Sequence, residues 1–190
     1  MSSKNIWDNE NLVKTLKNGG VVVIPTDTIY GIVGRAEEAD TVERIYKIRK
    51  RNKEKPCIIL ISEIEDLKKF SVQITEEQGK ILSEFFPASI PTSVILDCED
   101  SKHAYLHRDT NTLAFRMPTD EGLRNLIKQT GPILAPSANL EARPPSENID
   151  EARDYFGDFV DLYVDGGEIV GKASKIIRLH KDGTVSIIRL

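Results

Sequence analysis

Cysteine, histidine and tryptophan are scarce in this chain of 190 residues, which contains two Cys, three His and one Trp. Disulfide-stabilised domains and zinc sites depend on several closely spaced cysteines, whereas Cys57 and Cys98 are far apart. Both cysteines lie in apolar runs. We therefore expect two buried free thiols, with neither a disulfide framework nor a zinc site.

Long apolar stretches and targeting signals are also missing. No run approaches the ~20 apolar residues that a membrane-spanning helix needs. Residues 1–10 lack the basic start, apolar stretch and cleavage site of a signal peptide. The chain shows no internal repeat, flexible linker or glycine-rich Walker loop. We expect a cytoplasmic protein without membrane contact that folds as one domain over residues 1–190.

An excess of positive charge is absent as well. The 26 Lys and Arg are outnumbered by 30 Asp and Glu, which gives a net charge of −4. Proteins that bind nucleic acid through a broad surface usually carry a basic face. A site for an anion in this chain must therefore be a local concentration of Lys and Arg.

Strand-like and helix-like patterns alternate in an irregular order along the chain. Continuous aliphatic runs indicate buried strands, and apolar residues at helical spacing indicate amphipathic helices. We expect Asp40 to cap the second helix, and Thr75 with Gln78 to form a capping box on the third. The order predicts a single α/β domain with a twisted mixed sheet and flanking helices. The strands are expected at 21–24, 57–61, 93–96, 112–115, 133–135, 175–179 and 184–189, and the helices at 9–17, 40–50, 75–85, 120–128 and 148–156.

The first of three polar clusters follows the strand predicted at 21–24. Residues 25–31 read Pro-Thr-Asp-Thr-Ile-Tyr-Gly and include Thr28 and Tyr30. Two hydroxyls, a carboxylate and a phenol at one turn can make several hydrogen bonds to a ligand, and Gly31 allows close backbone approach. The alternative is an Asx-type turn that leads into another short strand.

The second cluster is a basic loop after the helix predicted at 40–50. Five cations occur within seven residues, where the helix C-terminus already favours positive charge. One guanidinium group can bind two phosphate oxygens through two parallel hydrogen bonds, whereas a Lys ammonium acts as a point charge. The loop therefore suits a triphosphate, and the alternative is a solvated charged loop. The cations are Arg49, Lys50, Arg51, Lys53 and Lys55.

The third cluster follows the strand predicted at 133–135. Ser137 and Asn139 offer hydrogen-bond donors and acceptors next to backbone amides, as a nucleotide requires. The alternative is a capped turn. Elsewhere, His103 and His107 are four residues apart and could face one side of a helix as metal ligands. Nothing else supports a metal site there, and a solvated loop is the favoured interpretation.

Together these segments resemble the YrdC-like threonylcarbamoyl-AMP synthases. That family carries the motifs P-T-[DE]-T-x-Y-G, K-x-R-x-x-x-[KN]-P, R-x-P, S-x-N and G-x-x-S-T in this order. The match extends over roughly residues 10–190, essentially the whole chain. The corresponding segments here are 25–31, Arg49-Lys50-Arg51 with Lys55-Pro56, Arg116-Met117-Pro118, Ser137-Ala138-Asn139 and Gly171-Lys172-Ala173-Ser174.

The resemblance implies a nucleotidyltransferase that condenses L-threonine, bicarbonate or CO2, and ATP with Mg²⁺ to threonylcarbamoyl-AMP and pyrophosphate. The product would serve the threonylcarbamoyladenosine modification of tRNA next to the anticodon, through a downstream tRNA threonylcarbamoyl transferase complex. A weak contact with double-stranded RNA is a further expectation. The chain is similar to the short, single-domain form of the family, because it stops just after its last predicted strand.

The resemblance also implies roles for individual residues. Three cations would hold the phosphates during catalysis: Arg49, Arg51 and Lys55. The ATP site would further include Lys50, Ser93, Ser137 and Asn139. The threonine pocket would be lined by Thr28, Tyr30, Arg116 and Ser174. Arg116 is the natural partner of a carboxylate, because its planar fork matches two oxygens.

This sequence departs from the family pattern at several positions. Arg49 stands where the family has Lys, and Lys50 could serve instead if the loop is shifted by one residue. A hydroxyl is retained at Ser93 in the segment that matches the family's P-x-T, whereas Lys175 and Glu141 replace family hydroxyls. Two alternatives therefore stay open. One is an RNA-binding module without chemistry, and the other is a carbamoyl-adenylate enzyme with another substrate.

Overall fold

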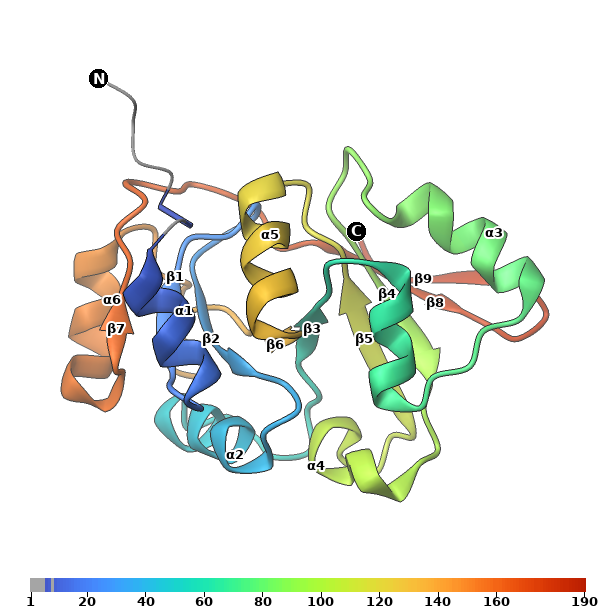
Figure 1. The fold of residues 1–190 in the computed structure, drawn as a ribbon, viewed down its shortest axis with the longest axis horizontal. Coiled ribbons are helices and arrows are strands. Elements are labelled where there is room, and N and C mark those ends of the chain that lie inside the picture. Colours follow the sequence, from blue (N-terminus) through green and yellow to red (C-terminus); the bar gives the residue numbers. More distant parts are fainter. Residues whose placement is uncertain (1–5, 8) are drawn as a thin grey trace.

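The computed structural model describes residues 6–7 and 9–190 (Figure 1). In this part of the chain, nine strands form one sheet in the order β7-β1-β2-β6-β3-β5-β4-β8-β9. The strands are β1 (Val22–Ile24), β2 (Gly31–Arg35), β3 (Ile58–Leu60), β4 (Thr92–Asp97), β5 (Thr112–Arg116), β6 (Ile133–Leu134), β7 (Leu162–Tyr163), β8 (Lys175–Leu179) and β9 (Val185–Arg189). The helices are α1 (Glu10–Lys17), α2 (Ala39–Ile48), α3 (Glu76–Phe85), α4 (Ala104–His107), α5 (Glu121–Thr130) and α6 (Ile149–Phe156). Three 3-10 helices are η1 (Ile64–Phe70), η2 (Ser101–His103) and η3 (Gly157–Phe159).

The sheet is mixed, as the sequence predicts. Pairs β1–β7, β3–β5 and β4–β8 are parallel. Pairs β1–β2, β2–β6, β3–β6, β4–β5 and β8–β9 are antiparallel. The prediction of an α/β fold with a mixed sheet and flanking helices is therefore confirmed.

Strand β1 is buried along its whole length, which explains its continuous aliphatic sequence, whereas every residue of the edge strand β9 is exposed. Val22 and Ile24 of β1 pack into one apolar cluster with α1 and α5, while Val23 between them packs into the other, with α2 and α6. This alternation follows from the two-residue period of a strand. Figure 1 shows α1 and α5 in front of the strands.

Most predicted helices and caps are present. Thr75 and Gln78 form the expected capping box on α3. The prediction that Asp40 caps α2 is wrong, because the cap is Glu38 and Asp40 lies in the first turn, where its charge suits the helix dipole. The same helix ends at Ile48, since Lys50 has a positive φ of 50° that a helix cannot contain.

The prediction that His103 and His107 lie in a solvated loop is wrong. Each residue is only 3% exposed, on η2 and α4 respectively. The reason is tertiary packing, since the ring of Phe70 lies 5.6 Å from that of His103. No group of three or more His, Cys, Asp or Glu that could bind a metal occurs among the residues that the structure describes. Cys57 and Cys98 are buried free thiols, as expected.

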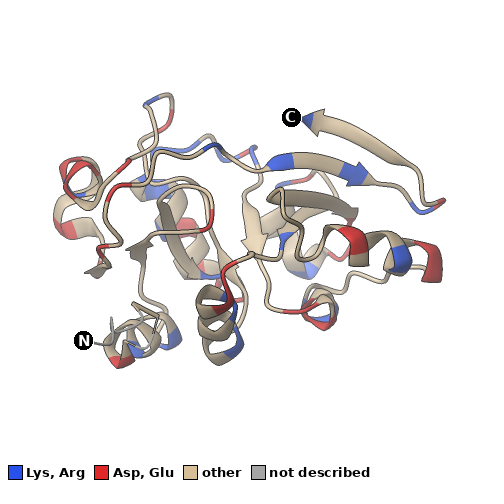
Figure 2. Ribbon diagram, turned by 90° about the horizontal axis from the view of Figure 1, so that it is seen from above, with Lys and Arg blue, Asp and Glu red and all other residues tan. Residues whose placement is uncertain are grey.

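Lys and Arg residues are interspersed with Asp and Glu residues along the ribbon (Figure 2). Helix α3 carries residues of both signs of charge, and strand β8 carries Lys175 and Arg178. Across the described part of the chain, no helix has the length and apolar character that crossing a membrane requires.

Candidate functional site

Segments that are far apart in the sequence line one cavity of about 200 Å³. They are the turn between β1 and β2, the end of the basic loop, the end of β5, the turn after β6, and the ends of β8 and β9. Among the described lining residues, three guanidinium groups come from three of these segments: Arg51, Arg116 and Arg189. Hydroxyls of Thr26, Thr28, Ser137 and Ser174 complete the polar lining. Such a set of donors suits an anionic ligand that also carries polar groups.

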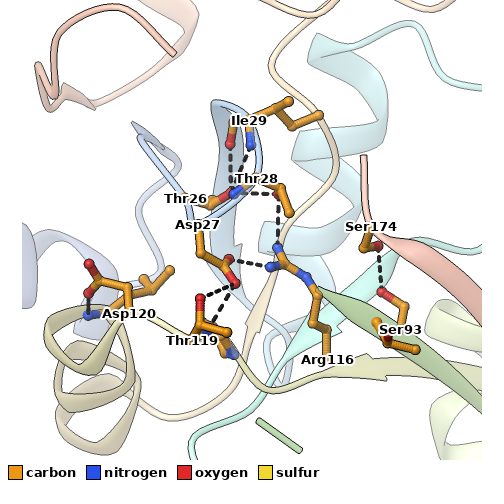
Figure 3. Close-up of polar contacts among 12 residues, drawn as sticks. Thr26, Asp27, Thr28, Ile29, Ser93, Arg116, Thr119, Asp120 and Ser174 are labelled. Atoms are coloured by element: carbon orange, nitrogen blue, oxygen red, sulfur yellow. Dashed lines mark hydrogen bonds and ion pairs between the residues drawn. The ribbon is translucent and has the colours of Figure 1, made fainter. Parts of the chain in front are cut away.

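Arg116 ends β5 and is 4% exposed. Its Nη1 forms an ion pair with Asp27, and its Nη2 donates to the Thr28 hydroxyl at 3.3 Å (Figure 3). The Asp27 carboxylate also accepts from the backbone N–H of Thr119 at 3.0 Å. Arg116 is thus ion-paired with a nearby acid, which is Asp27 and not Asp120, since Asp120 accepts from the N–H of Leu123 and caps α5.

The turn that contains Thr28 is held by its own hydroxyls. Thr26 Oγ1 donates to the Ile29 carbonyl at 2.6 Å and accepts from the N–H of Thr28 and of Ile29. Because its single hydrogen points at Ile29, the 3.0 Å contact with Thr28 Oγ1 uses the hydrogen of Thr28. The short strand expected after the turn, β2, is present, but the turn is held by the Thr26 hydroxyl and not by Asp27 as an Asx-type turn requires.

Tyr30 is fully buried and is one of the residues that line the cavity. Its hydroxyl donates to the Gly167 carbonyl at 2.7 Å and accepts from the Gly166 N–H at 2.9 Å. Burial raises the pKa of Tyr30, so the phenol stays protonated at neutral pH. The hydroxyl is thus occupied by backbone groups from a segment 136 residues further along the chain.

Arg49 is 2% exposed, and its guanidinium holds the turn that contains Ser137 and Asn139 in place. Its Nε donates to the Asn139 carbonyl at 3.0 Å, and its Nη2 donates to Asn139 Oδ1 at 2.9 Å and to Ser137 Oγ at 3.3 Å. Burial, followed by the positive charge of Arg51, lowers the pKa of Arg49 to about 10. The guanidinium therefore remains charged at neutral pH, and its visible contacts are with the turn.

The remaining cations of the basic loop differ in their positions. Arg51 reaches the cavity wall, and its guanidinium donates to the carbonyls of Lys55 at 3.2 Å and Pro56 at 3.0 Å. Lys55 is exposed and pairs with Glu141 at 2.9 Å. Lys50 is exposed and lies in a separate surface hollow that Arg51 shares. Arg51 is thus the member of this loop that contacts the cavity among the lining residues described.

Ser137 and Asn139 form a capped turn, and Ser137 also lines the cavity. The Ser137 hydroxyl donates to Asn139 Oδ1 at 2.6 Å, while Asn139 Nδ2 donates to the carbonyls of Leu140 and Arg143. The amide of Asn139 is therefore occupied by the turn itself. Across the cavity, Ser174 contacts Ser93 at 2.8 Å, and Ser174 lies on the lining side of this buried pair.

The structure thus brings six predicted site residues to the cavity: Thr28, Tyr30, Arg51, Arg116, Ser137 and Ser174. Five others lie outside the described lining: Arg49, Lys50, Lys55, Ser93 and Asn139. Sequence reasoning missed Arg189, whose guanidinium donates to the Ser174 carbonyl at 2.6 and 3.2 Å and lines the cavity. Burial lowers the pKa of Arg189. No local pattern marks it, because only the β8–β9 pairing returns it to the site.

The fold and the cavity define an α/β protein with an arginine-lined cavity whose donors suit a polar anionic ligand. The chain belongs to the Sua5/YciO/YrdC family, whose family model, described as "Telomere recombination", matches residues 14–190. The family expected from the sequence motifs is therefore confirmed.

Relatives of the chain carry a common name. The threonylcarbamoyl-AMP synthase of Pyrococcus abyssi is 32% identical over 167 residues, which cover 86% of this chain and 48% of that protein. The threonylcarbamoyl-AMP synthase of Bacillus subtilis is 32% identical over 171 residues, covering 88% and 49%. The chain thus spans about half the length of these two relatives. The crystal structure of P. abyssi Sua5 complexed with L-threonine is similar, with a TM-score of 0.81 and 28% identity, covering 92% of this chain and 52% of that one.

Proposed function

We propose that this chain is an L-threonylcarbamoyladenylate synthase, an enzyme of the nucleotidyltransferase class. It would condense L-threonine, bicarbonate or CO2, and ATP to threonylcarbamoyl-AMP and pyrophosphate. The observation that carries the proposal is the cavity where Arg51, Arg116 and Arg189 meet hydroxyls from four further residues. The names of the P. abyssi and B. subtilis relatives support it, as does the threonine bound to P. abyssi Sua5.

The nucleotide would lie at the side of the cavity formed by Arg51 and Ser137. Arg51 supplies a guanidinium for the phosphates, and Ser137 a hydroxyl beside the backbone of a fixed turn. Arg49 and Asn139 would act indirectly, because the hydrogen bonds between them hold the turn of Ser137 in place. Lys50 and Lys55 would add positive charge near the cavity. Mg²⁺ would accompany ATP as part of the substrate, since this ion is commonly bound through substrate phosphates.

Threonine would occupy the side formed by Thr28, Arg116 and Ser174, with the Tyr30 ring as an apolar wall. Arg116 is the proposed partner of its carboxylate. Two of the five guanidinium N–H groups are already directed at Asp27 and Thr28. The Nε–H is buried without a partner, and the second hydrogens of the two terminal nitrogens keep the capacity for a carboxylate. Ser174, supported by Ser93, would bind a further polar group of the amino acid.

The reaction that follows is a matter of positioning and charge. The neutral amine of threonine adds to CO2 and releases one proton to solvent, or it condenses with bicarbonate and releases water; either route gives a carbamate. A carbamate oxygen then attacks the α-phosphorus of ATP, the bond to the bridging oxygen breaks, and pyrophosphate leaves with the electron pair. Negative charge builds on phosphate oxygens in this step, so fixed guanidinium groups stabilise it. Holding both substrates in one small cavity supplies the proximity.

The product would be passed to a tRNA threonylcarbamoyl transferase complex in the cytoplasm. A weak RNA contact would use the exposed lysines of the basic loop, Lys50, Lys53 and Lys55. The interspersed charges over the helices favour a local contact of this kind over a broad basic face (Figure 2).

Product analysis tests the proposal directly. The protein is incubated with ATP, Mg²⁺, bicarbonate and threonine, and products are identified by mass spectrometry while pyrophosphate is measured. We expect threonylcarbamoyl-AMP and pyrophosphate only when threonine and bicarbonate are both present. Pyrophosphate release at the same rate without threonine would contradict the proposal. An adduct with another amine would indicate the carbamoyl-adenylate alternative, and RNA binding without ATP cleavage would indicate the RNA-binding module.

A further inference from the structure

The segment 164–174, here called the strap, joins β7 to β8 without any helix, strand or turn. In the described sheet, β7 and β8 are separated by six other strands. Adjacent strands lie ~4.8 Å apart, so the seven spacings between β7 and β8 take the strap roughly 34 Å across the sheet. The chain from Tyr163 to Lys175 reaches at most about 43 Å when fully extended. The strap therefore has little spare length, and Figure 1 shows it running along the upper side of the sheet in orange-red.

The strap lies on the turn that contains Thr28. A Cβ added at Gly166 would come 2.6 Å from Pro25 Cγ, and one at Gly171 would overlap the Thr28 carbonyl oxygen. Both positions therefore require glycine for the backbone to approach this closely. This close approach alone contributes little to holding the strap against the turn, because most strap residues are exposed.

Hydrogen bonds of the buried Tyr30 side chain hold the strap in place. Its buried hydroxyl accepts from the Gly166 N–H at 2.9 Å and donates to the Gly167 carbonyl at 2.7 Å. Both bonds leave one side chain and end on consecutive strap residues. A second tie is the N–H of Ile169, which donates to the Glu147 carbonyl at 2.7 Å.

The C-terminal end of the strap lines the cavity. Ala173 and Ser174 line it, and the Ser174 carbonyl accepts both hydrogen bonds from Arg189. Because the strap has little spare length, a shift at Gly166 is passed on along the backbone towards Ser174. The position of Ser174, and with it that of Arg189, therefore depends on how the strap is fastened at Tyr30.

We propose that Tyr30 is a positioning residue whose hydroxyl fastens the strap, and that the strap thereby sets the place of Ser174 in the substrate cavity. Tyr30 then acts on an amino-acid substrate through the strap, and its own hydroxyl does not bind that substrate. The effect on threonine rests on the function proposed above, whereas the fastening of the strap does not.

Limited trypsin digestion measures the fastening without any activity. Lys172 is exposed within the strap, so cleavage after this residue, identified by mass spectrometry, reports strap opening. Tyr30→Phe removes the two hydroxyl bonds and keeps the ring, and cleavage at Lys172 should become about five- to thirty-fold faster. Cleavage after Lys53 in the basic loop should not change. Tyr105→Phe is the matched control, since it removes one hydroxyl-to-carbonyl bond of 3.0 Å, to Ala36, away from the strap.

A second variant disturbs the strap from its own side. Gly171→Ala leaves Tyr30 intact and forces the strap away from the Thr28 carbonyl, so it should also accelerate cleavage at Lys172. In both variants the KM for threonine should rise by about five- to thirty-fold, with the KM for ATP within about twofold of wild type. Thermal melts establish that the variants are folded at the assay temperature.

The two measurements separate the two proposals. Unchanged cleavage at Lys172 in both folded variants would overturn the strap proposal, whatever the activity. Faster cleavage with an unchanged threonine KM would overturn the positioning of Ser174 through the strap. Faster cleavage in a protein that does not use threonine at all would support the fastening by Tyr30 and refute the proposed function.

Discussion

Arg116 and Asp27 form a buried ion pair, with side-chain exposures of 5% and 4%. The backbone N–H of Thr119 donates to the second oxygen of the Asp27 carboxylate. The Thr28 hydroxyl accepts from Nη2 of Arg116. The guanidinium is therefore fixed in direction before any ligand binds. Removing one partner of a buried pair leaves the other charge unpaired, which typically costs about 3–5 kcal/mol.

This arrangement predicts that Arg116→Lys harms threonine use more than ATP binding. Lys keeps a positive charge for Asp27 but has no planar fork, so it cannot also fix Thr28 and orient a carboxylate. A displacement of the amine by about 1 Å could lower the rate on the order of a hundred-fold. Steady-state constants for both substrates decide the matter. A variant with wild-type rate and threonine KM would show that Arg116 serves only the Asp27 pair.

Arg51→Ala is expected to weaken ATP binding. Loss of a charge-assisted contact should cost about 1.5–3 kcal/mol, or roughly ten- to a hundred-fold in affinity. Lys55→Ala should have a smaller effect, because Lys55 is paired with Glu141 outside the described cavity lining. Lys53→Ala is the control from the same loop. Titration calorimetry with ATP provides the affinities, and equal affinity of the Arg51 variant and wild type would remove Arg51 from the site.

The buried His103 predicts a loss of stability in mild acid. Burial lowers the pKa of His103; Lys102 and His107 lower it further, while Asp100 and Glu37 oppose them. The unfolded chain, with a His pKa of about 6.5, therefore binds a proton more readily than the folded protein. Its contribution to stability is complete above that pKa and decreases as the pH falls through about 6.5 towards the lower folded pKa.

Urea denaturation at a series of pH values between 8 and 5 checks this expectation, with about half-unit steps to resolve the slope. His103→Phe keeps an aromatic ring against Phe70 but cannot titrate, so its stability should vary less over this range. An equally steep loss in the variant would assign the effect to other groups.

The capping box of α3 predicts a modest and separable loss of stability. Thr75 Oγ1 accepts from the Gln78 N–H at 3.1 Å, and the Gln78 side chain accepts from the Thr75 N–H at 3.0 Å. Thr75→Ala should therefore cost about 1 kcal/mol, and Thr75→Ser much less. Thermal melts of the two variants provide the comparison. Equal losses in both would show that the hydroxyl contributes nothing to the cap.

Structural features whose sequence pattern spans only a few neighbouring residues were predicted correctly. The capping box at Thr75, the strand at β1 and the hairpin of β8 and β9 were all expected from neighbouring residues. The strand β7 was missed because it has two residues and exists only through pairing with β1. The burial of His103 was missed because polar residues between two strands resemble a loop until a core packs over them.

The candidate site shows the same division. The sequence by itself determined the family, the mixed α/β fold and the polar turns, since their motifs and periodicities are local and keep their order along the chain. Tertiary structure alone decided which groups meet. It paired Arg116 with Asp27, returned Arg189 to the cavity and turned the Tyr30 hydroxyl to the strap. The physical reason is that a buried polar group must find a partner, and that partner is set by strand order and loop length across the fold, which no local pattern contains.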